Sequence, residues 1–294
     1  MSILRIKNLS KTYSNGVKAL ANVNLELHNG MFGLLGPNGA GKSSLMRTLA
    51  TLQEADTGSI TLDDINIIEQ PAKLREVLGY LPQEFGVYSR ITAQQLLHHI
   101  ATLKGFTQAS ERKEMVAYLL DKVNLYEKRN KSVKKFSGGM KQRFGIAQAL
   151  IGNPKLLIVD EPTAGLDPTE RNRFYNLLAD VSSEVIVILS THIVEDVKEL
   201  CTDMAIMNLG KVIYQGTPSK AVEELQGKIY QKKIARSELQ TYSQDHNIIA
   251  TRMIEGHLHI FTHSDTRPGQ NFEVASPNLE DVFFLKINRS KSTS

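Results

Sequence analysis

The sequence predicts an α/β protein with a mostly parallel core sheet, an antiparallel β edge, an inserted α-helical subdomain and a small C-terminal α+β appendage. Three observations predict this fold. An apolar segment at 31–35 leads through a glycine-rich loop into a helix at 44–50. Residues 92–151 have helical signals almost throughout. After them, strand-length apolar segments alternate with helical ones from 155 to 208, which is the pattern of a parallel sheet.

The first part of the chain combines strands with turns. Period-two apolarity predicts strands at 3–9 and 23–27. A further short strand is expected at 58–62, followed by a helix over 69–75. A strand at 77–81 then ends at a proline.

The helical section is expected to form a subdomain at about 84–151. Thr92 and Ser110 are the predicted N-caps of its helices, and loop signals lie near Gly105 and Asn130. Its last helix opens after a Ser-Gly-Gly sequence and covers 140–151. The alternating segments that follow are expected to be strands 155–160, 185–190 and 204–208 and helices 168–181 and 193–200.

The alternation of strands and helices ends at about residue 226, so we expect two units, 1–225 and 226–294. The second unit has predicted strands at 229–234, 248–254 and 257–263, a helix at 279–287, and a polar, frayed tail at 288–294. Three histidines share one face of the strand 257–263. We interpret that face as solvated rather than metal-binding, with Leu258 and Ile260 on the buried face.

Composition limits the classes of protein. The chain has 294 residues, 41% of them hydrophobic and 22% charged, which is ordinary for a globular protein. No apolar run approaches the roughly 18 residues of a membrane-spanning helix, and nothing at the N-terminus resembles a signal peptide. The single cysteine excludes an internal disulfide and suits a reducing cytosol. A net charge of +4 does not by itself imply a nucleic-acid partner.

The glycine-rich loop carries the strongest chemical signal. It reads Gly36-Pro37-Asn38-Gly39-Ala40-Gly41-Lys42-Ser43 and fits G-x-x-x-x-G-K-[ST], the pattern of loops that bind phosphates. Unpaired N–H groups and the dipole of the following helix point at the same place, which makes an anion site. Lys42 supplies a cation, and Ser43 offers a hydroxyl to Mg²⁺. The loop therefore predicts a site for a nucleoside triphosphate.

Two carboxylates follow the buried strand at 155–160. Successive strand side chains point in opposite directions, so Asp160 and Glu161 are expected to face different points. Asp160 is predicted to face the Mg²⁺ beside Ser43. Glu161 is predicted to lie near the γ-phosphate, where a glutamate polarises the attacking water and accepts its proton.

A third motif reads Phe136-Ser137-Gly138-Gly139-Met140-Lys141-Gln142-Arg143. Together with the phosphate loop, it resembles the nucleotide-binding subunit of an ABC transporter, and the resemblance covers residues 1–225. It implies a P-loop NTPase of ABC type, in which this signature motif of one subunit closes over the γ-phosphate bound by another. Ser137 is expected to cap a helix whose N-terminus meets the anion, while Gly138 and Gly139 permit close approach.

The resemblance assigns further residues by position. Tyr13 matches the aromatic residue that stacks on adenine, and Gln83 matches the glutamine that touches Mg²⁺ or water. Asp167 matches the loop that couples the two sites of the dimer, and His192 matches the histidine that contacts the γ-phosphate. The implied catalytic set is Glu161, His192, Gln83 and Lys42; the ATP-binding set is Tyr13 with Gly36, Pro37, Asn38, Gly39, Ala40, Gly41, Lys42, Ser43 and Ser44; and the Mg²⁺ ligands are Ser43, Gln83 and Asp160.

One departure concerns the signature. The family commonly has Leu-Ser-Gly-Gly-Gln, whereas this chain has Phe136 and Met140 at the two ends. Only the last position loses an amide, so we expect an active site with at most an altered rate.

On this resemblance the chain is expected to be the ATP-hydrolysing subunit of an ABC transporter, with ATP and Mg²⁺ as cofactors. The expected partners are a separate transmembrane permease and a second ATP-binding subunit, a second copy rather than a paralogue, with no nucleic acid. The expected location is peripheral, on the cytoplasmic face of the cell membrane. The segment Ser276-Pro277-Asn278-Leu279-Glu280-Asp281-Val282-Phe283-Phe284 resembles one common in ABC-2-type exporters, which favours export over import.

Two alternatives belong to other classes. A soluble ABC-type ATPase of translation usually carries two such cassettes in one chain, and one of DNA maintenance separates its motifs by long coiled coils. A small-molecule kinase with the same phosphate loop has no use for Ser137-Gly138-Gly139 or His192.

Overall fold

A computed structural model describes residues 1–83, 86, 91–163 and 165–292. Among these residues the strands form three sheets, and the largest is the core sheet predicted from the alternating segments. Its strand order is β10-β9-β3-β8-β7-β6, with all neighbours parallel except β10 and β9. The strands are β3 (Gly30–Leu35), β6 (Leu78–Leu81), β7 (Leu156–Asp160), β8 (Ile186–Thr191), β9 (Asp203–Asn208) and β10 (Lys211–Gly216).

A smaller antiparallel sheet forms the predicted β edge, in the order β2-β1-β4-β5. Two of its strands are longer than period-two apolarity predicted, because their pairing continues through the polar end of β1 and through residues 18–22 of β2, where the apolar alternation is interrupted. The strands are β1 (Ile3–Thr12), β2 (Lys18–His28), β4 (Thr57–Leu62) and β5 (Ile65–Asn66).

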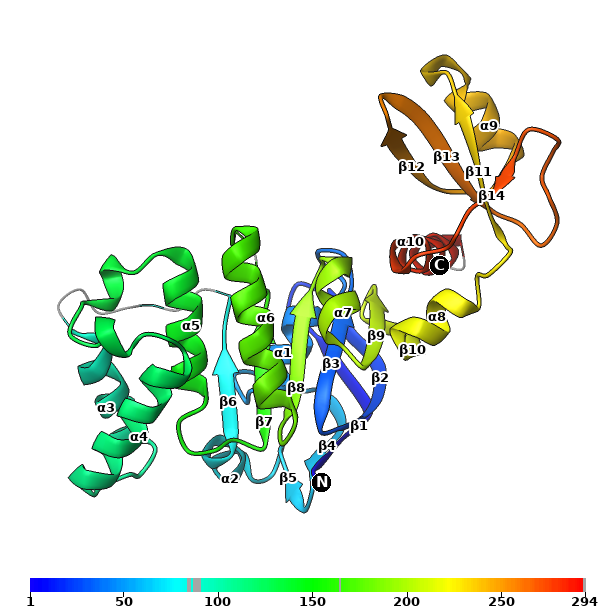
Figure 1. Cartoon of the computed structure of the whole chain (residues 1–294). Coiled ribbons are helices and arrows are strands. Elements are labelled where there is room, and N and C mark those ends of the chain that lie inside the picture. The colour runs from blue at the N-terminus through cyan, green and yellow to red at the C-terminus, as the bar shows by residue number, and fades with distance from the viewer. Residues whose placement is uncertain (84–85, 87–90, 164, 293–294) are drawn as a thin grey trace.

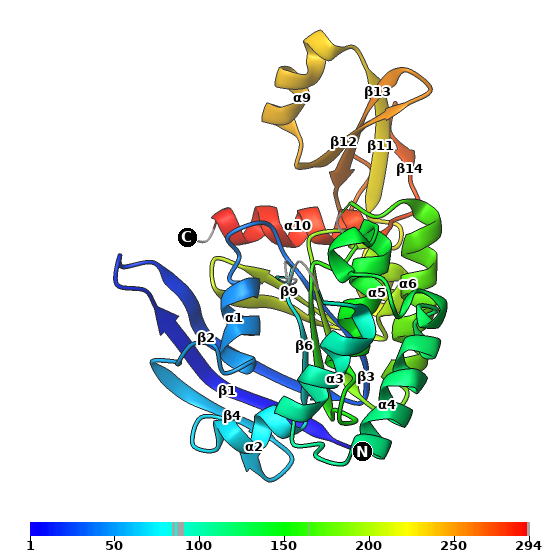
Figure 2. The same cartoon turned by 90° about the vertical axis from the view of Figure 1, so that its left-hand side faces the viewer.

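The two faces of the core sheet belong to two different apolar cores. In β7, Leu156 and Ile158 pack with the antiparallel sheet and helix α1 (Lys42–Leu49), whereas Leu157 and Val159 pack against the helices of the other face. Strand alternation accounts for this division, since a strand buried on both faces has apolar side chains throughout. Figure 2 shows α1 between the two sheets. The opposite face is covered by α5 (Gly138–Ala149), α6 (Pro168–Ser182) and α7 (Val194–Leu200).

The inserted helices lie beyond β6, at the far side of the core sheet from the C-terminal part of the chain (Figure 1). They are α3 (Ala93–Leu103), α4 (Ala109–Lys122) and α5, with short 3₁₀ turns at Tyr126–Lys128 and Val133–Lys135. Thr92 caps α3 as predicted, in a capping box with Gln95. The predicted start of the subdomain at residue 84 lies outside the described residues.

Several predicted boundaries were wrong. Ser110 does not cap α4, because that helix already begins at Ala109 and its N-cap is Gln108, which makes no side-chain cap bond. Helix α5 begins at Gly138 rather than 140, since Ser137 occupies the cap position. Helix α2 (Pro71–Glu76) starts at its proline instead of residue 69, because proline suits the first turn of a helix.

The C-terminal part contains the third sheet, in the order β12-β13-β11-β14. The predicted strands are present as β11 (Ile229–Ile234), β12 (Ile248–Ile254) and β13 (His257–His263). Sequence patterns missed the short elements α8 (Pro218–Glu223), α9 (Leu239–Asp245) and β14 (Glu273–Val274). The histidine face of β13 is not solvated as a whole, because Phe261 on that face is buried in the larger core.

Helix α10 (Leu279–Ser292) lies between the third sheet and the rest of the chain (Figure 2). Leu279, Val282 and Leu285 are buried in one apolar core with residues of β3, β8 and α7. The predicted frayed tail at 288–294 was wrong for residues 288–292, which continue this helix; its end is held by a hydrogen bond of 2.6 Å from Asn208 Nδ2 to Ser290 Oγ. The domain boundary at 225/226 stays a prediction. In the described part, no helix is long and apolar enough to cross a membrane.

Candidate functional site

The residues predicted to bind and hydrolyse ATP meet at the edge of the core sheet where the parallel strands end. The phosphate loop follows β3, Glu161 follows β7 and His192 follows β8, so their positions result from the parallel strand order. A cleft of about 600 Å³ opens there. It is lined by Tyr13, Val17, Lys18, Ala19, Asn38, Gly39, Ala40, Gly41, Lys42, Ser43, Ser44, Gln83, Glu161 and Leu209.

The glycines of the phosphate loop are required by close packing and by backbone angles. A Cβ on Gly36 would lie 2.6 Å from the Met207 carbonyl oxygen, and one on Gly41 would lie 2.4 Å from that of Ala19. Gly41 also has φ of 104° and precedes α1 with no side-chain cap. The first N–H groups of α1 are therefore left for an anion.

Lys42 is buried within its own loop, with 5% of its surface exposed. Its Nζ donates hydrogen bonds to the carbonyl oxygens of Gly36 (2.8 Å) and Pro37 (3.3 Å) and lies 3.9 Å from Glu161 Oε1. Burial lowers the pKa of the Lys42 ammonium, and this effect outweighs the negative charges of Glu161 and Asp160, which raise it. A polyphosphate in the cleft would stabilise the charged form.

Asp160 ends β7 with only 6% of its surface exposed. Its Oδ1 is buried and has no hydrogen-bond partner among the described residues. Burial raises the pKa of this carboxyl, and the neighbouring charge of Glu161 raises it further. An unpaired buried carboxylate oxygen is costly, and it is also the ligand that Mg²⁺ prefers. Since Ser43 and Gln83 line the cleft, the residues present fit this ion.

Glu161 turns into the cleft through an unusual backbone conformation. Its φ is 46°, in the left-handed region, while its N–H donates to the Ser190 carbonyl oxygen (2.9 Å). Its Oε1 lies 3.2 Å from His192 Nδ1, and Gln83 Nε2 donates to its Oε2 (3.4 Å). The structure therefore brings Glu161 together with Lys42, His192 and Gln83, as the motif positions predicted.

Tyr13 lies at the mouth of the cleft with 37% of its surface exposed. Its hydroxyl lies 2.9 Å from Ser44 Oγ and donates to Gln53 Oε1 (3.0 Å). Gln53 also donates to the Ser44 carbonyl oxygen and to Thr48 Oγ1, so it fixes the ring beside α1. Sequence reasoning missed Gln53 because it belongs to no motif, and only the folded chain places it there.

The signature motif is separate from this cleft. Ser137 caps α5 and accepts a hydrogen bond from the Met140 N–H (3.3 Å), as predicted, and both Ser137 and Gly138 are exposed. Gly139 is buried, and a Cβ there would lie 2.3 Å from Glu170 Oε2, so this glycine permits the close approach of Glu170; its role toward a phosphate stays a prediction. The half-buried Met140 packs against the larger core.

Glu170 on α6 is a residue that sequence reasoning missed. It lies beneath Gly139 and forms ion pairs with Arg143 Nε (3.4 Å) and Arg173 Nη1 (2.8 Å). Asp167 caps the same helix by accepting from the Glu170 N–H (2.9 Å). The loop before α6 and the signature helix are thus joined. The role of Asp167 in coupling two chains stays a prediction, and the preceding Ala164 lies outside the described residues.

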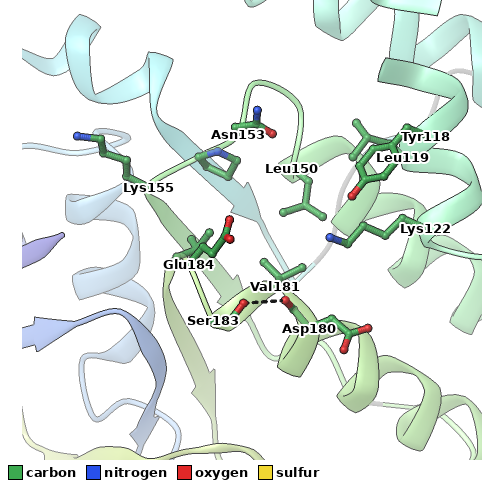
Figure 3. Close-up of a pocket in the computed structure, with 12 residues that line it drawn as sticks. Tyr118, Leu119, Lys122, Leu150, Asn153, Lys155, Asp180, Val181, Ser183 and Glu184 are labelled. Carbon is green, nitrogen blue, oxygen red and sulfur yellow. Dashed lines mark hydrogen bonds between the residues drawn. The ribbon is translucent and has the colours of Figure 1, made fainter. Parts of the chain in front are cut away.

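A second cavity, of about 540 Å³, is remote from the predicted site residues. It lies between the end of α4, the turn before β7 and the end of α6 (Figure 3). Figure 3 shows the Lys122 amine directed toward the cavity, while the Lys155 side chain points away; Lys155 pairs with Asp63 (3.1 Å). None of the predicted site residues lines it.

Comparisons with known proteins identify the family of this chain. A family model described as ABC transporter matches residues 20–164. The probable multidrug ABC transporter ATP-binding protein YbhF of Escherichia coli is 33% identical over 96% of this chain, which spans about half (51%) of that relative's length. The daunorubicin/doxorubicin resistance ATP-binding protein DrrA of Streptomyces peucetius is 31% identical over 90% of this chain and 78% of its own.

Solved structures show the same architecture. The dimeric structure of MJ0796, a bacterial ABC transporter cassette, has a TM-score of 0.67 and 26% identity, and the match covers 73% of this chain and 98% of that one. Its dimeric post-hydrolysis state, bound to ADP and Pi, has a TM-score of 0.66 at the same coverage. The fold is therefore that of an ABC-type ATP-binding cassette.

Proposed function

This chain belongs to the family of ABC transporter ATP-binding proteins, and on that premise we propose that it binds and hydrolyses ATP to drive a separate transmembrane permease. The observation that carries the proposal is the convergence of Lys42, Glu161 and His192 at one cleft whose loop has the phosphate-binding pattern. Concentrating charged groups in this way is unfavourable for folding, so such a cluster is typical of a functional site rather than of a sheet edge with only a structural role.

The roles of the chain's own residues follow from this geometry. The N–H groups at the start of α1 and the Lys42 ammonium hold the phosphates, and the exposed ring of Tyr13 stacks on the base. Glu161 accepts a proton from the attacking water, and His192, 3.2 Å away, holds the carboxylate and contacts the γ-phosphate. Ser43, Gln83 and Asp160 would hold Mg²⁺, which would supply positive charge at the phosphate oxygens.

The second half of each site is proposed to come from a second copy of the chain. Ser137 and Gly138 are exposed at the start of α5 and lie outside the cleft of their own chain. The related MJ0796 cassette is dimeric, which supports this arrangement. ATP then joins the two copies, and hydrolysis loosens their interface.

We further propose that the partner is the permease of an ABC-2-type exporter, at the cytoplasmic face of the membrane. The names of the relatives YbhF and DrrA, which refer to multidrug transport and to drug resistance, support export. So does the segment 276–284, whose residues from 279 onward form the start of α10. Co-purification with an importer-type permease and its binding protein would overturn this direction.

Glu161→Gln tests the proposal. The full chain with ATP and Mg²⁺ is expected to release phosphate, whereas the variant loses turnover, still binds ATP, and elutes as an ATP-dependent dimer on size exclusion. Glu184→Gln, at an exposed residue remote from the cleft, is the matched control and should behave as the original chain. A Glu161→Gln monomer with undiminished hydrolysis would refute the proposed function.

A further inference from the structure

Asp196 is a fully buried carboxylate that no sequence motif singled out. It lies in the first turn of α7, with 0% of its surface exposed. Three hydroxyls donate to it: Tyr175 to Oδ1 (2.5 Å), and Thr163 (2.6 Å) and Thr191 (2.9 Å) to Oδ2. No lysine or arginine in the described part of the chain forms an ion pair with it.

Each of the three donors adjoins a different part of the proposed site. Thr163 follows Glu161 by two residues, and Thr191 immediately precedes His192. Tyr175 belongs to α6, the helix that Asp167 caps. Thr191 Oγ1 also accepts the Ile193 N–H (2.9 Å), so the backbone on both sides of His192 is tied to the carboxylate. One buried group therefore joins three segments that are distant in sequence.

The cost of such a group argues against a role in stability alone. Burying a carboxylate among apolar residues is unfavourable, and hydrogen bonds offset that cost without making the group better than a well-packed apolar side chain. What the carboxylate adds is direction, because each hydroxyl must point at one of two fixed oxygens. Strands β7 and β8 are neighbours in the core sheet, and Glu161 and His192, which follow them, lie 3.2 Å apart at their ends.

We propose that Asp196 is a positioning residue for ATP hydrolysis, holding the segments after β7 and β8 so that His192 stays in contact with Glu161. The inference rests on the proposed function. It assigns no contact between Asp196 and ATP, and the catalytic groups remain Glu161 and His192. The Thr191 hydroxyl transmits the constraint to His192, and the Thr163 hydroxyl transmits it to the segment of Glu161.

The first test measures ATP turnover and the KM for ATP separately. Asp196→Asn preserves the shape but offers an N–H₂ where a hydroxyl needs an acceptor, so kcat is expected to fall about 30-fold with KM changed less than about threefold. Glu195→Gln, at the exposed neighbouring carboxylate that pairs only with Lys198 within α7, is the matched control and should keep the original kcat. An unchanged kcat for Asp196→Asn would overturn the inference.

A double-mutant cycle separates positioning from a loss of fold. Thr191→Val removes one donor, and its kcat is expected to fall about tenfold in the original chain but to be unchanged in a His192→Ala background. An equal fold-change in both backgrounds would show that Thr191 acts elsewhere, and it would overturn the inference while leaving the proposed function intact. Tyr175→Phe gives a second cycle should Asp196→Asn fail to fold. Undiminished hydrolysis in both Glu161→Gln and His192→Ala would instead remove the proposed function.

Discussion

Two buried aspartates, one at the nucleotide cleft and one in α10, differ in whether their carboxylate oxygens have partners. Asp160 has a buried oxygen with no hydrogen-bond partner in the described chain. Asp281 has 0% exposure and uses both oxygens: Arg252 Nη2 lies 2.8 Å from Oδ1, and the Asn278 N–H donates to Oδ2 (2.9 Å). The first site is incomplete within the chain, and the second is complete.

At these two positions, the difference separates a residue that we propose to serve a ligand from one that joins two segments of the fold. A buried carboxylate with an unsatisfied oxygen lowers stability, so such a group persists where an absent partner completes it. A fully paired carboxylate joins segments, and Asp281 joins the start of α10 to β12. Substitutions at the two aspartates should therefore separate activity from stability.

The largest expected effect is the loss of activity in Asp160→Asn. We expect ATP turnover to fall by about 10²-fold or more, because the carboxylate proposed to hold the metal is gone. The melting temperature should not fall. Burial raises the pKa of the Asp160 carboxyl, which means that its charged form is unfavourable in the folded chain, and the variant removes that charge. Phosphate release and thermal melting are measured together, with Asp64→Asn at an exposed position as the control. A variant that loses both stability and turnover would break the comparison.

The second effect is the loss of stability in Asp281→Ala. The substitution removes the acceptor 2.8 Å from Arg252, which keeps the longer contacts to Asn278 (3.4 Å) and Glu280 (3.3 Å), and it also leaves the Asn278 N–H without the Asp281 carboxylate. We expect the free energy of unfolding to fall by about 3 kcal/mol. Urea unfolding measures this, and the turnover per folded molecule should be retained. Glu280→Gln, at the exposed neighbour 3.3 Å from Arg252, should change stability by less than about 0.5 kcal/mol. Equal effects of the two substitutions would contradict the role of Asp281.

The signature glycines extend the comparison to α5. Gly139→Ala places a methyl group against Glu170, and we expect it to lower the free energy of unfolding by about 1–3 kcal/mol. Gly138→Ala meets nothing within 4 Å in its own chain, so the monomer should keep its stability. If Gly138 faces the partner's ATP, its substitution lowers turnover without lowering the melting temperature. A destabilised Gly138→Ala chain would argue against an open position.

The smallest effect concerns the pH dependence of stability at His263, the last residue of β13. Burial lowers the pKa of His263, and the charges of Arg289 and Lys228 lower it further against Asp265. Above pH 6.5 the stability contributed by the neutral imidazole is fully present, and it is lost as the pH falls through the lowered pKa. The melting temperature of the original chain should therefore fall relative to His263→Gln between pH 8 and pH 5. A constant difference across this range would show that His263 does not titrate differently on unfolding.

Local signals accounted for most of the elements and for the order of the motifs. The strand before Gly36, the Thr92 cap and the apolar run of β7 were predictable because short-range backbone preferences decide them. The Ser110 cap was wrong because the helix begins at Ala109, so that the N-cap position falls on Gln108, two residues before Ser110. The tail after residue 287 was wrong because its polar composition hides a helix that is anchored at Ser290.

The sequence by itself determined an ABC-type cassette and its phosphate loop, and it named the residues that we propose to bind ATP. Only the tertiary structure decided how those residues are held. Three contacts join segments that are distant in sequence: the packing of Glu170 beneath Gly139, the hydrogen bonds of three hydroxyls to Asp196, and the ion pair of Arg252 with Asp281. Motif spacing reports neighbours along the chain, whereas these contacts depend on how helices and strands pack, which no local pattern specifies.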